Sequence, residues 1–215
     1  MTTSAAIRGK GDAAARRPCY PRRMSNPARK LLTVDEFLAA YEGREGFWEL
    51  WDGVPVERDG GPTAISPERV VHLSAKLEAA VALREAVRSA GLGCKVLPDG
   101  ATVRIRANRA FVPDALVVCP PPPAHAMEID NPVVVVEVVS PASLSVDHGE
   151  KLEGYFSLPS VQHYLILDPD KRTVIHHSRG ADFIATRILH EGRLRLEPPG
   201  LTVEVEELFG SAATS

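Results

Sequence analysis

The sequence lacks the features of a disulfide-stabilised, zinc-stabilised or membrane-spanning protein. Its three cysteines, Cys19, Cys94 and Cys119, form no CxxC pair. This spacing argues against a disulfide framework and a structural zinc site, so we expect free, reduced thiols. Its apolar runs are far shorter than the ~20 residues that a membrane helix needs. Because the N-terminal residues also lack a secretory signal pattern, we expect a cytoplasmic protein with no membrane contact.

Several catalytic signatures are also absent. The chain has no Gly-rich phosphate loop, no Gly-x-Ser-x-Gly elbow and no Cys-His signature, so P-loop nucleotide hydrolysis and acyl transfer are unsupported.

The composition, with 44% hydrophobic and 25% charged residues, is typical of a globular protein. A length of 215 residues allows one domain with a substantial core and is too short for two of ordinary size.

Charge is unevenly distributed along the chain. Residues 1–30 hold eight lysines or arginines and one acidic residue, Asp12, which leaves 17 basic and 27 acidic residues in positions 31–215. We therefore predict a disordered basic arm over residues 1–30, a domain over 31–209 and a flexible tail over 210–215. The acidic domain repels phosphate backbones, so net charge alone gives no support to nucleic-acid binding.

Local motifs predict the first structural elements. A capping box from Thr33 to Glu36 opens a helix through about Tyr41. Asp52-Gly53 is a strong hairpin signal between two short apolar strands. A long helix follows Ser66-Pro67, with apolar residues at helical spacing from Val70 to Val87.

The order of the remaining elements indicates an α/β fold with a mixed central β-sheet flanked by helices. Residues 133–167 form a βαβ unit, whose right-handed crossover lays its two strands parallel or nearly so. The strands that we predict after the long helix are residues 95–97, 102–106, 114–118, 133–139, 161–167, 173–177 and 183–189, with a helix over 147–157.

Glu137 is the most informative residue of the sequence. It lies in the run Val133–Val139, which otherwise predicts a strand buried on both faces, where an unpaired carboxylate is strongly destabilising. A divalent metal would justify such a carboxylate, and Asp114 at the head of another apolar strand is a second candidate ligand. The alternative is that burial neutralises Glu137 or that it pairs with an internal lysine or arginine.

The motifs around these carboxylates resemble those of the PD-(D/E)XK nuclease superfamily. Pro113-Asp114, followed by Glu137 in an apolar strand, matches the superfamily core. More specifically, the chain resembles the Uma-two family of restriction-endonuclease-fold proteins, from about Leu31 to Phe209. The segments that carry this resemblance are residues 111–118, 135–141, 149–152, Tyr155 and 164–169. The resemblance implies a restriction-endonuclease-like fold and an endonuclease activity.

The resemblance also implies a set of site residues. Asp114 and Glu137 would be oxygen ligands to Mg²⁺ or Mn²⁺, and the main-chain carbonyl of Val138 could add a ligand. Glu49 matches an additional acidic residue that related nucleases contribute from an early element. Strand alternation alone is equally consistent with Glu49 as an exposed hairpin residue.

The lysine of the superfamily pattern is displaced in this chain. Its usual position, two residues after the glutamate, is occupied by Val139, which cannot orient a water. We expect Lys151 on the following helix to take that role, because its long side chain can reach back over the strand end. The alternative is a surface pair between Lys151 and Asp147. Tyr155 either holds the ammonium group or is a half-buried core residue.

These roles predict a metal-dependent endonuclease that hydrolyses phosphodiester bonds, in DNA rather than RNA, with Mg²⁺ or Mn²⁺ as its cofactor. A homodimer is plausible because small nucleases that cut two strands often use paired sites. The alternative function is a catalytically inactive nuclease fold that serves as a binding or assembly module. The acidic domain and the absence of a lysine at position 139 motivate that alternative.

Overall fold

A computed structural model of the chain describes residues 30–58, 69–139 and 147–210. The predicted basic arm up to residue 29 and the predicted tail from residue 211 lie outside these residues, as does the predicted helix start at Ser66-Pro67.

The first elements follow the local sequence signals. Helix α1 (Val34–Tyr41) carries the predicted capping box, with the Glu36 amide donating to Thr33 Oγ1 at 3.2 Å. Strands β1 (Trp48–Trp51) and β2 (Val54–Glu57) form the predicted antiparallel hairpin. The φ angles of Asp52 and Gly53 are 50° and 82°, and this left-handed pair is the reason why Asp-Gly suits the turn.

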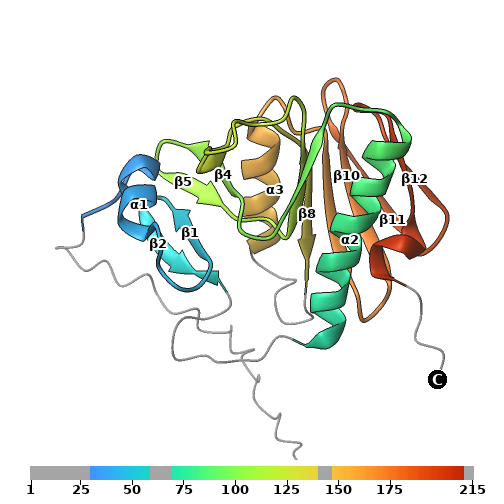
Figure 1. The fold of residues 1–215 in the computed structure, drawn as a ribbon, viewed down its shortest axis with the longest axis horizontal. Helices are drawn as coiled ribbons and strands as arrows, with labels where there is room; N and C mark the ends of the chain where they lie inside the picture. The colour runs from blue at the N-terminus through green and yellow to red at the C-terminus, as the bar shows by residue number, and fades with distance from the viewer. Residues whose placement is uncertain (1–29, 59–68, 140–146, 211–215) are drawn as a thin grey trace, which may run out of the picture. The chain divides into compact units, whose positions relative to one another are not determined.

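A six-stranded mixed sheet forms the centre of the fold (Figure 1). Strand β8 (Pro132–Val138) pairs in parallel with β9 (His163–Asp168), and helix α3 (Asp147–Ser157) lies between them in sequence, which confirms the βαβ unit. The remaining neighbours are antiparallel. In spatial order the sheet consists of β11 (Ile184–Leu189), β10 (Thr173–Arg179), β9 (His163–Asp168), β8 (Pro132–Val138), β6 (Ala115–Val118) and β3 (Lys95–Pro98).

The hairpin β1–β2 belongs to a second sheet of five strands rather than to the central one. Its other members are β5 (Arg109–Phe111), β4 (Thr102–Arg106) and β7 (Glu128–Ile129). A two-stranded sheet of β12 (Arg193–Leu196) and β13 (Leu201–Glu204) precedes the short 3-10 helix η2 (Val205–Phe209). The sequence did not predict β5, β7, β12 or β13, because segments of two to four residues give almost no periodic signal.

Helices α2 (Val70–Ser89) and α3 (Asp147–Ser157) cover opposite faces of the central sheet. Val134 and Val136 pack in the cluster that contains α2, whereas Val135 and Val139 pack in the cluster that contains Tyr155 of α3. Strand β8 is therefore buried on both faces, as its valine run predicts.

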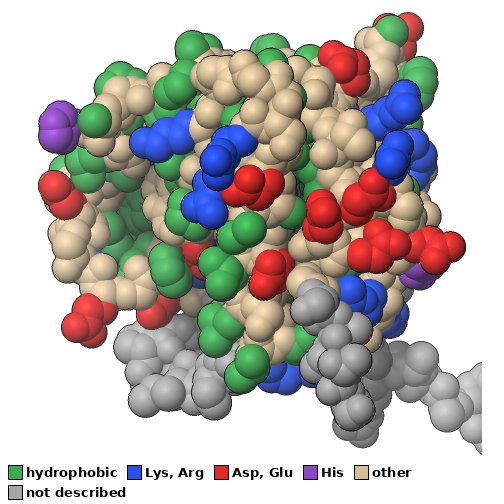
Figure 2. Space-filling model, turned by 45° about the vertical axis from the view of Figure 1, so that its right-hand side comes forward, with side chains coloured by type: hydrophobic (Ala, Val, Ile, Leu, Met, Phe, Trp, Pro, Cys, Tyr) green, Lys and Arg blue, Asp and Glu red, His purple; other side chains and the backbone are tan. Residues whose placement is uncertain are grey.

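Helix α2 buries small residues and exposes several large ones. Val70, Leu73 and Leu77, three of the apolar positions that predicted this helix, are more than half exposed, at 77%, 51% and 62%. Hydrophobic side chains accordingly appear on the face shown in Figure 2, beside a group of acidic side chains. The α2 residues that the sheet covers are mainly alanines, which let the helix approach it closely: Ala75, Ala79, Ala82, Leu83 and Ala86.

The described helices do not include one with both the length and the apolar content needed to cross a membrane.

The expectation of free thiols is wrong for two of the cysteines. Cys94 and Cys119 form a disulfide with a Cα–Cα distance of 4.5 Å. Antiparallel pairing sets Lys95 opposite Val118, so the cysteines that flank this pair also face each other. A separation of 25 residues without a CxxC motif hides this pairing from the sequence.

We expect the disulfide to stabilise the fold. Replacing both partners (Cys94→Ser with Cys119→Ser) should lower the free energy of unfolding by about 3 kcal/mol, because the unfolded chain regains the entropy of an open loop. Urea denaturation of the two proteins measures this difference, and reduction of the parent protein should reproduce it. Equal midpoints for the parent, reduced parent and variant would contradict the prediction.

Candidate active site

Strand pairing brings the two predicted metal ligands together. Asp114 directly precedes β6, and its amide donates to the Val136 carbonyl of β8 at 3.0 Å. Glu137 is the next residue of β8, so the two carboxylates lie at the same end of neighbouring strands. Both side chains are buried, with residue exposures of 1% for Asp114 and 4% for Glu137.

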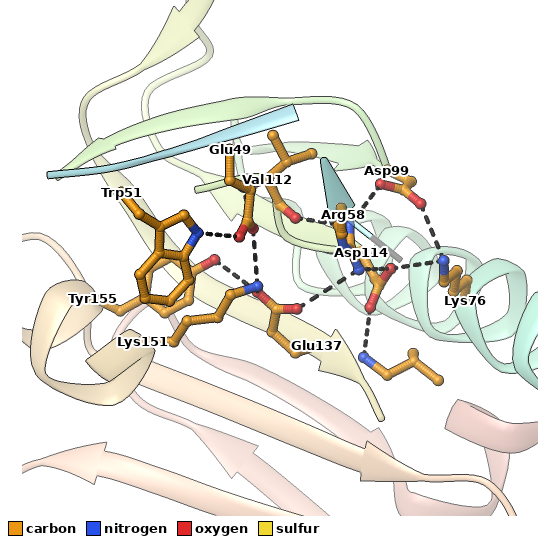
Figure 3. A network of polar contacts seen from close by, with 11 residues as sticks. Glu49, Trp51, Arg58, Lys76, Asp99, Val112, Asp114, Glu137, Lys151 and Tyr155 are labelled. Atoms are coloured by element: carbon orange, nitrogen blue, oxygen red, sulfur yellow. Dashed lines mark hydrogen bonds and ion pairs between the residues drawn. The ribbon is translucent and has the colours of Figure 1, made fainter. Parts of the chain in front are cut away.

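Helix α3 supplies two partners to Glu137 (Figure 3). Glu137 Oε1 accepts hydrogen bonds from Lys151 Nζ at 2.9 Å and from the Tyr155 hydroxyl at 2.8 Å. Lys151 is only 6% exposed, so its ammonium group points inward and is not part of a surface pair. Tyr155 lies in the core, as one of the two alternatives predicts, but it is fully rather than half buried, and its hydroxyl donates to the Glu137 carboxylate.

Glu49 joins the same network from β1. Its Oε1 lies 2.9 Å from Lys151 Nζ and accepts the Val112 amide at 3.1 Å, while Oε2 accepts Trp51 Nε1 at 3.0 Å. The residue is 4% exposed, so the alternative of an exposed hairpin residue is wrong. The reason is that both faces of β1 are covered: Leu50 packs with residues of α1, and Glu49 on the other face meets Lys151 of α3.

Sequence reasoning missed Arg58, which follows β2 and reaches both predicted ligands (Figure 3). Its Nη2 lies 2.5 Å from Asp114 Oδ1 and 3.7 Å from Glu137 Oε2. Its Nη1 donates to the Val112 carbonyl at 2.8 Å and to Asp99 Oδ1 at 3.1 Å. No local motif marks this arginine, because its role depends on the packing of the two sheets.

Lys76 and Asp99 were also missed. Lys76 Nζ lies 3.1 Å from Asp114 Oδ1 and 3.3 Å from Asp99 Oδ2. A weak signal for Lys76 was present, since it lies on α2 between Ala75 and Ala79, two residues of the buried helix face. Asp99 lies in the turn between β3 and β4, where an aspartate is an ordinary turn residue.

The site combines four carboxylates with three cationic side chains among the described residues, which leaves one excess negative charge. Burial raises the pKa of Glu137 above its ordinary value of 4.5, against the lowering effects of Lys151 and Arg58. Burial by itself lowers the pKa of Lys151, but Glu137 and Glu49 outweigh it and raise that pKa, so Lys151 remains an ammonium ion.

Asp114 and Glu137 carry carboxylate oxygens, which are suitable ligands for a divalent cation such as Mg²⁺. Arg58 Nη2 already places a cationic nitrogen between Asp114 Oδ1 and Glu137 Oε2, so both oxygens face a site for positive charge. The described residues include no group of three or more His, Cys, Asp or Glu side chains that could hold a metal. Two carboxylates are nevertheless enough for Mg²⁺, which keeps several waters and shares substrate phosphate oxygens.

Val138 contacts the site through its amide. The N–H of Val138 donates to Asp114 Oδ2 at 2.6 Å, which orients the carboxylate and leaves Oδ1 to face the cations. The predicted contribution of this residue was its carbonyl, so the contact in the structure involves a different backbone group.

Comparison with known proteins places the chain in a family. The sequence model of the Uma2 (Uma-two) family, described as "Putative restriction endonuclease", matches residues 34–210, which is most of the chain. The chain belongs to the Uma2 family. A putative nuclease belonging to DUF820 from Anabaena variabilis has a similar crystal structure, with a TM-score of 0.64 over 83% of this chain and 97% of that one. At 17% identity, this likeness concerns the fold alone.

A relative in Synechocystis, an uncharacterized protein, is 29% identical over 104 residues, which cover 47% of this chain. The match spans 55% of that relative's length. For this Uma2 chain, the family resemblance is thus confirmed, and the four side chains that it implicated lie in one buried network (Figure 3): Glu49, Asp114, Glu137 and Lys151.

We expect Glu137→Gln to raise the thermal midpoint of the metal-free protein at pH 8. Because the folded-state pKa of Glu137 is raised, its stabilising effect is full below the unfolded value and is lost as pH rises through the folded value. Glutamine cannot ionise and keeps an oxygen for Lys151 and Tyr155. The advantage of the variant should therefore shrink as pH falls toward 4.5.

Thermal unfolding of both proteins in EDTA across this pH range measures the effect. Glu150→Gln is the matched control, because the Glu150 side chain pairs with Arg109 but is 48% exposed. A loss of stability of more than ~2 kcal/mol in Glu137→Gln would contradict the prediction and show that the ion pair with Lys151 outweighs the cost of burying the Glu137 charge.

Proposed function

We propose that this Uma2 protein is a metal-dependent endonuclease that hydrolyses phosphodiester bonds in DNA, with Mg²⁺ or Mn²⁺ bound by Asp114 and Glu137. One observation carries the proposal: two buried carboxylates from neighbouring strands converge on one position for positive charge, and a buried lysine contacts the second of them. Membership in a family described as "Putative restriction endonuclease" supports the same activity.

We assign a separate role to each side chain of this site. Asp114 and Glu137 would hold the cation, while the Val138 amide and the Tyr155 hydroxyl fix the orientation of the two carboxylates. A bound Mg²⁺ or Mn²⁺ would supply Lewis acidity, which activates water and neutralises phosphate charge. Lys151 stays protonated, so we assign it to stabilising the negative charge of the transition state rather than to accepting a proton.

DNA binding would have to overcome the acidic character of residues 31–215. The face in Figure 2 carries acidic and basic side chains side by side, so it offers no continuous basic surface to a phosphate backbone. We therefore propose that DNA approaches the end of the central sheet where Asp114 precedes β6 and Glu137 lies near the end of β8. For cleavage of both strands, we propose that two copies of the chain act together.

A second candidate function is a catalytically inactive binding or assembly module. The observation that favours it is the pairing of the carboxylates by Arg58, Lys76 and Lys151, which balances most of the buried charge without a metal. A protein of this kind would use the network for stability alone. The metal-binding experiment below separates the two functions.

Mn²⁺ binding should depend on Asp114. We expect one Mn²⁺ per site in the parent and none in Asp114→Ala, because a single remaining carboxylate is too weak a donor set for a hard cation. Isothermal titration calorimetry measures this binding. Asp35→Ala, which removes an exposed carboxylate paired with Arg104, is the control and should bind as the parent does. A parent that binds no Mn²⁺ would favour the inactive module.

Cleavage should depend on Lys151 more than metal binding does. Lys151→Met keeps the aliphatic stem but removes the ammonium group, so the cleavage rate of linear DNA at saturating Mn²⁺ should fall by ~10²-fold or more. Because Glu49 and Glu137 lose a shared partner, Glu49→Gln should be added to the variant to limit destabilisation.

Two measurements and one control variant are needed to interpret the cleavage rate of the double variant. Circular dichroism verifies the fold, calorimetry verifies Mn²⁺ binding, and Glu49→Gln alone shows how much of the loss comes from Glu49. Cleavage by the double variant at the rate of Glu49→Gln would eliminate the role of Lys151. Cleavage of RNA in preference to DNA by the parent would instead revise the substrate.

A further inference from the structure

The guanidinium group of Arg58 occupies the position between the two proposed metal ligands. Its Nη2 is 2.5 Å from Asp114 Oδ1 and 3.7 Å from Glu137 Oε2, so the same nitrogen faces both carboxylates. The Arg58 side chain is held there by the Val112 carbonyl and by Asp99, and it is only 11% exposed. A metal ion that bridged these oxygens would need the space that Arg58 now fills.

Lys76 provides an internal comparison. It carries the same charge, contacts the same Asp114 oxygen at 3.1 Å and lies 3.3 Å from Asp99 Oδ2. Its side chain is buried to a similar degree, at 13% exposed. Lys76 therefore neutralises the site from one side, whereas Arg58 lies between the ligands.

The charge balance of the site favours an exchange of Arg58 for a dication. With Arg58 in place, four carboxylates face three single positive charges. If a divalent ion replaced Arg58, the four carboxylates would face two lysines and the dication, and the buried charge would be neutral. Low-dielectric surroundings make such a balance energetically important.

We propose that Arg58 is a built-in competitor of the metal, which fills the metal position of the metal-free protein and must be displaced before Mg²⁺ or Mn²⁺ binds. This inference rests on the proposed function, because it concerns the same metal site. It adds that the site has two mutually exclusive occupants. The apparent metal affinity of the protein then equals the intrinsic affinity of the free site multiplied by the fraction of molecules in which Arg58 has left it.

Metal titration of three proteins tests the competition: the parent, Arg58→Met and Lys76→Met. Mn²⁺ binding is followed at pH 8 by calorimetry and by electron paramagnetic resonance of the free ion, so catalysis is not needed. We expect Arg58→Met to bind Mn²⁺ ~10-fold more tightly than the parent or better, because the competing group is gone. Lys76→Met, which removes an equal charge but leaves Arg58 in place, should change the affinity much less.

The outcomes separate this inference from the proposed function. Equal affinity of Mn²⁺ for the parent and Arg58→Met would overturn the competition while leaving the metal site intact. An equal gain in Arg58→Met and Lys76→Met would also overturn it, because general electrostatics would then explain the effect. Absence of Mn²⁺ binding in all three proteins would remove the metal site and, with it, this inference.

A second measurement follows the parent protein and needs a variant only to assign the signal. In protein labelled with ¹⁵N-arginine, the side-chain signal of Arg58, assigned by its loss in Arg58→Lys, should shift as Mg²⁺ is added and saturate with one ion per chain. The signal of Arg109, which pairs with Asp52 and Glu150 away from the two ligands, is the internal control and should stay in place. An unchanged Arg58 signal with Mg²⁺ bound would overturn the proposal.

Discussion

The ion pair between Lys151 and Glu137 is the interaction on which the rest of the site depends. Strand β8 is buried on both faces, so a carboxylate within it needs a compensating charge. Lys151 supplies that charge at 2.9 Å and joins helix α3 to the central sheet. Because Glu49 shares the same ammonium group, the pair also ties the second sheet to this helix.

The network is assembled from segments that lie far apart in the chain. Glu49 and Arg58 come from the early hairpin and the residue after it, Lys76 from α2, and Asp114 and Glu137 from the central sheet. Each sheet therefore contributes charge to the interface with the other. This charge network forms only when the two sheets and the helices are packed together, so the proposed metal binding would depend on the integrity of the fold.

Much of the fold could be predicted from local patterns. The capping box at Thr33, the Asp52-Gly53 turn and the βαβ unit around Glu137 are correct, because each depends on residues close together in sequence. The assembly of the second sheet and the Cys94–Cys119 disulfide could not be predicted. Packing, rather than a local pattern, decides which strands become neighbours.

The sequence by itself determined that Glu137 is a charged residue in a buried strand, and this conflict pointed to the site and to its family. Asp114, Lys151 and Glu49 followed from the family motifs. Only the tertiary structure decided which cations meet those carboxylates. Arg58 reaches Asp114 across 56 residues of chain, and no local motif records a contact that arises when two sheets pack together. Long-range electrostatic pairing depends on three-dimensional position, which the order of residues does not display.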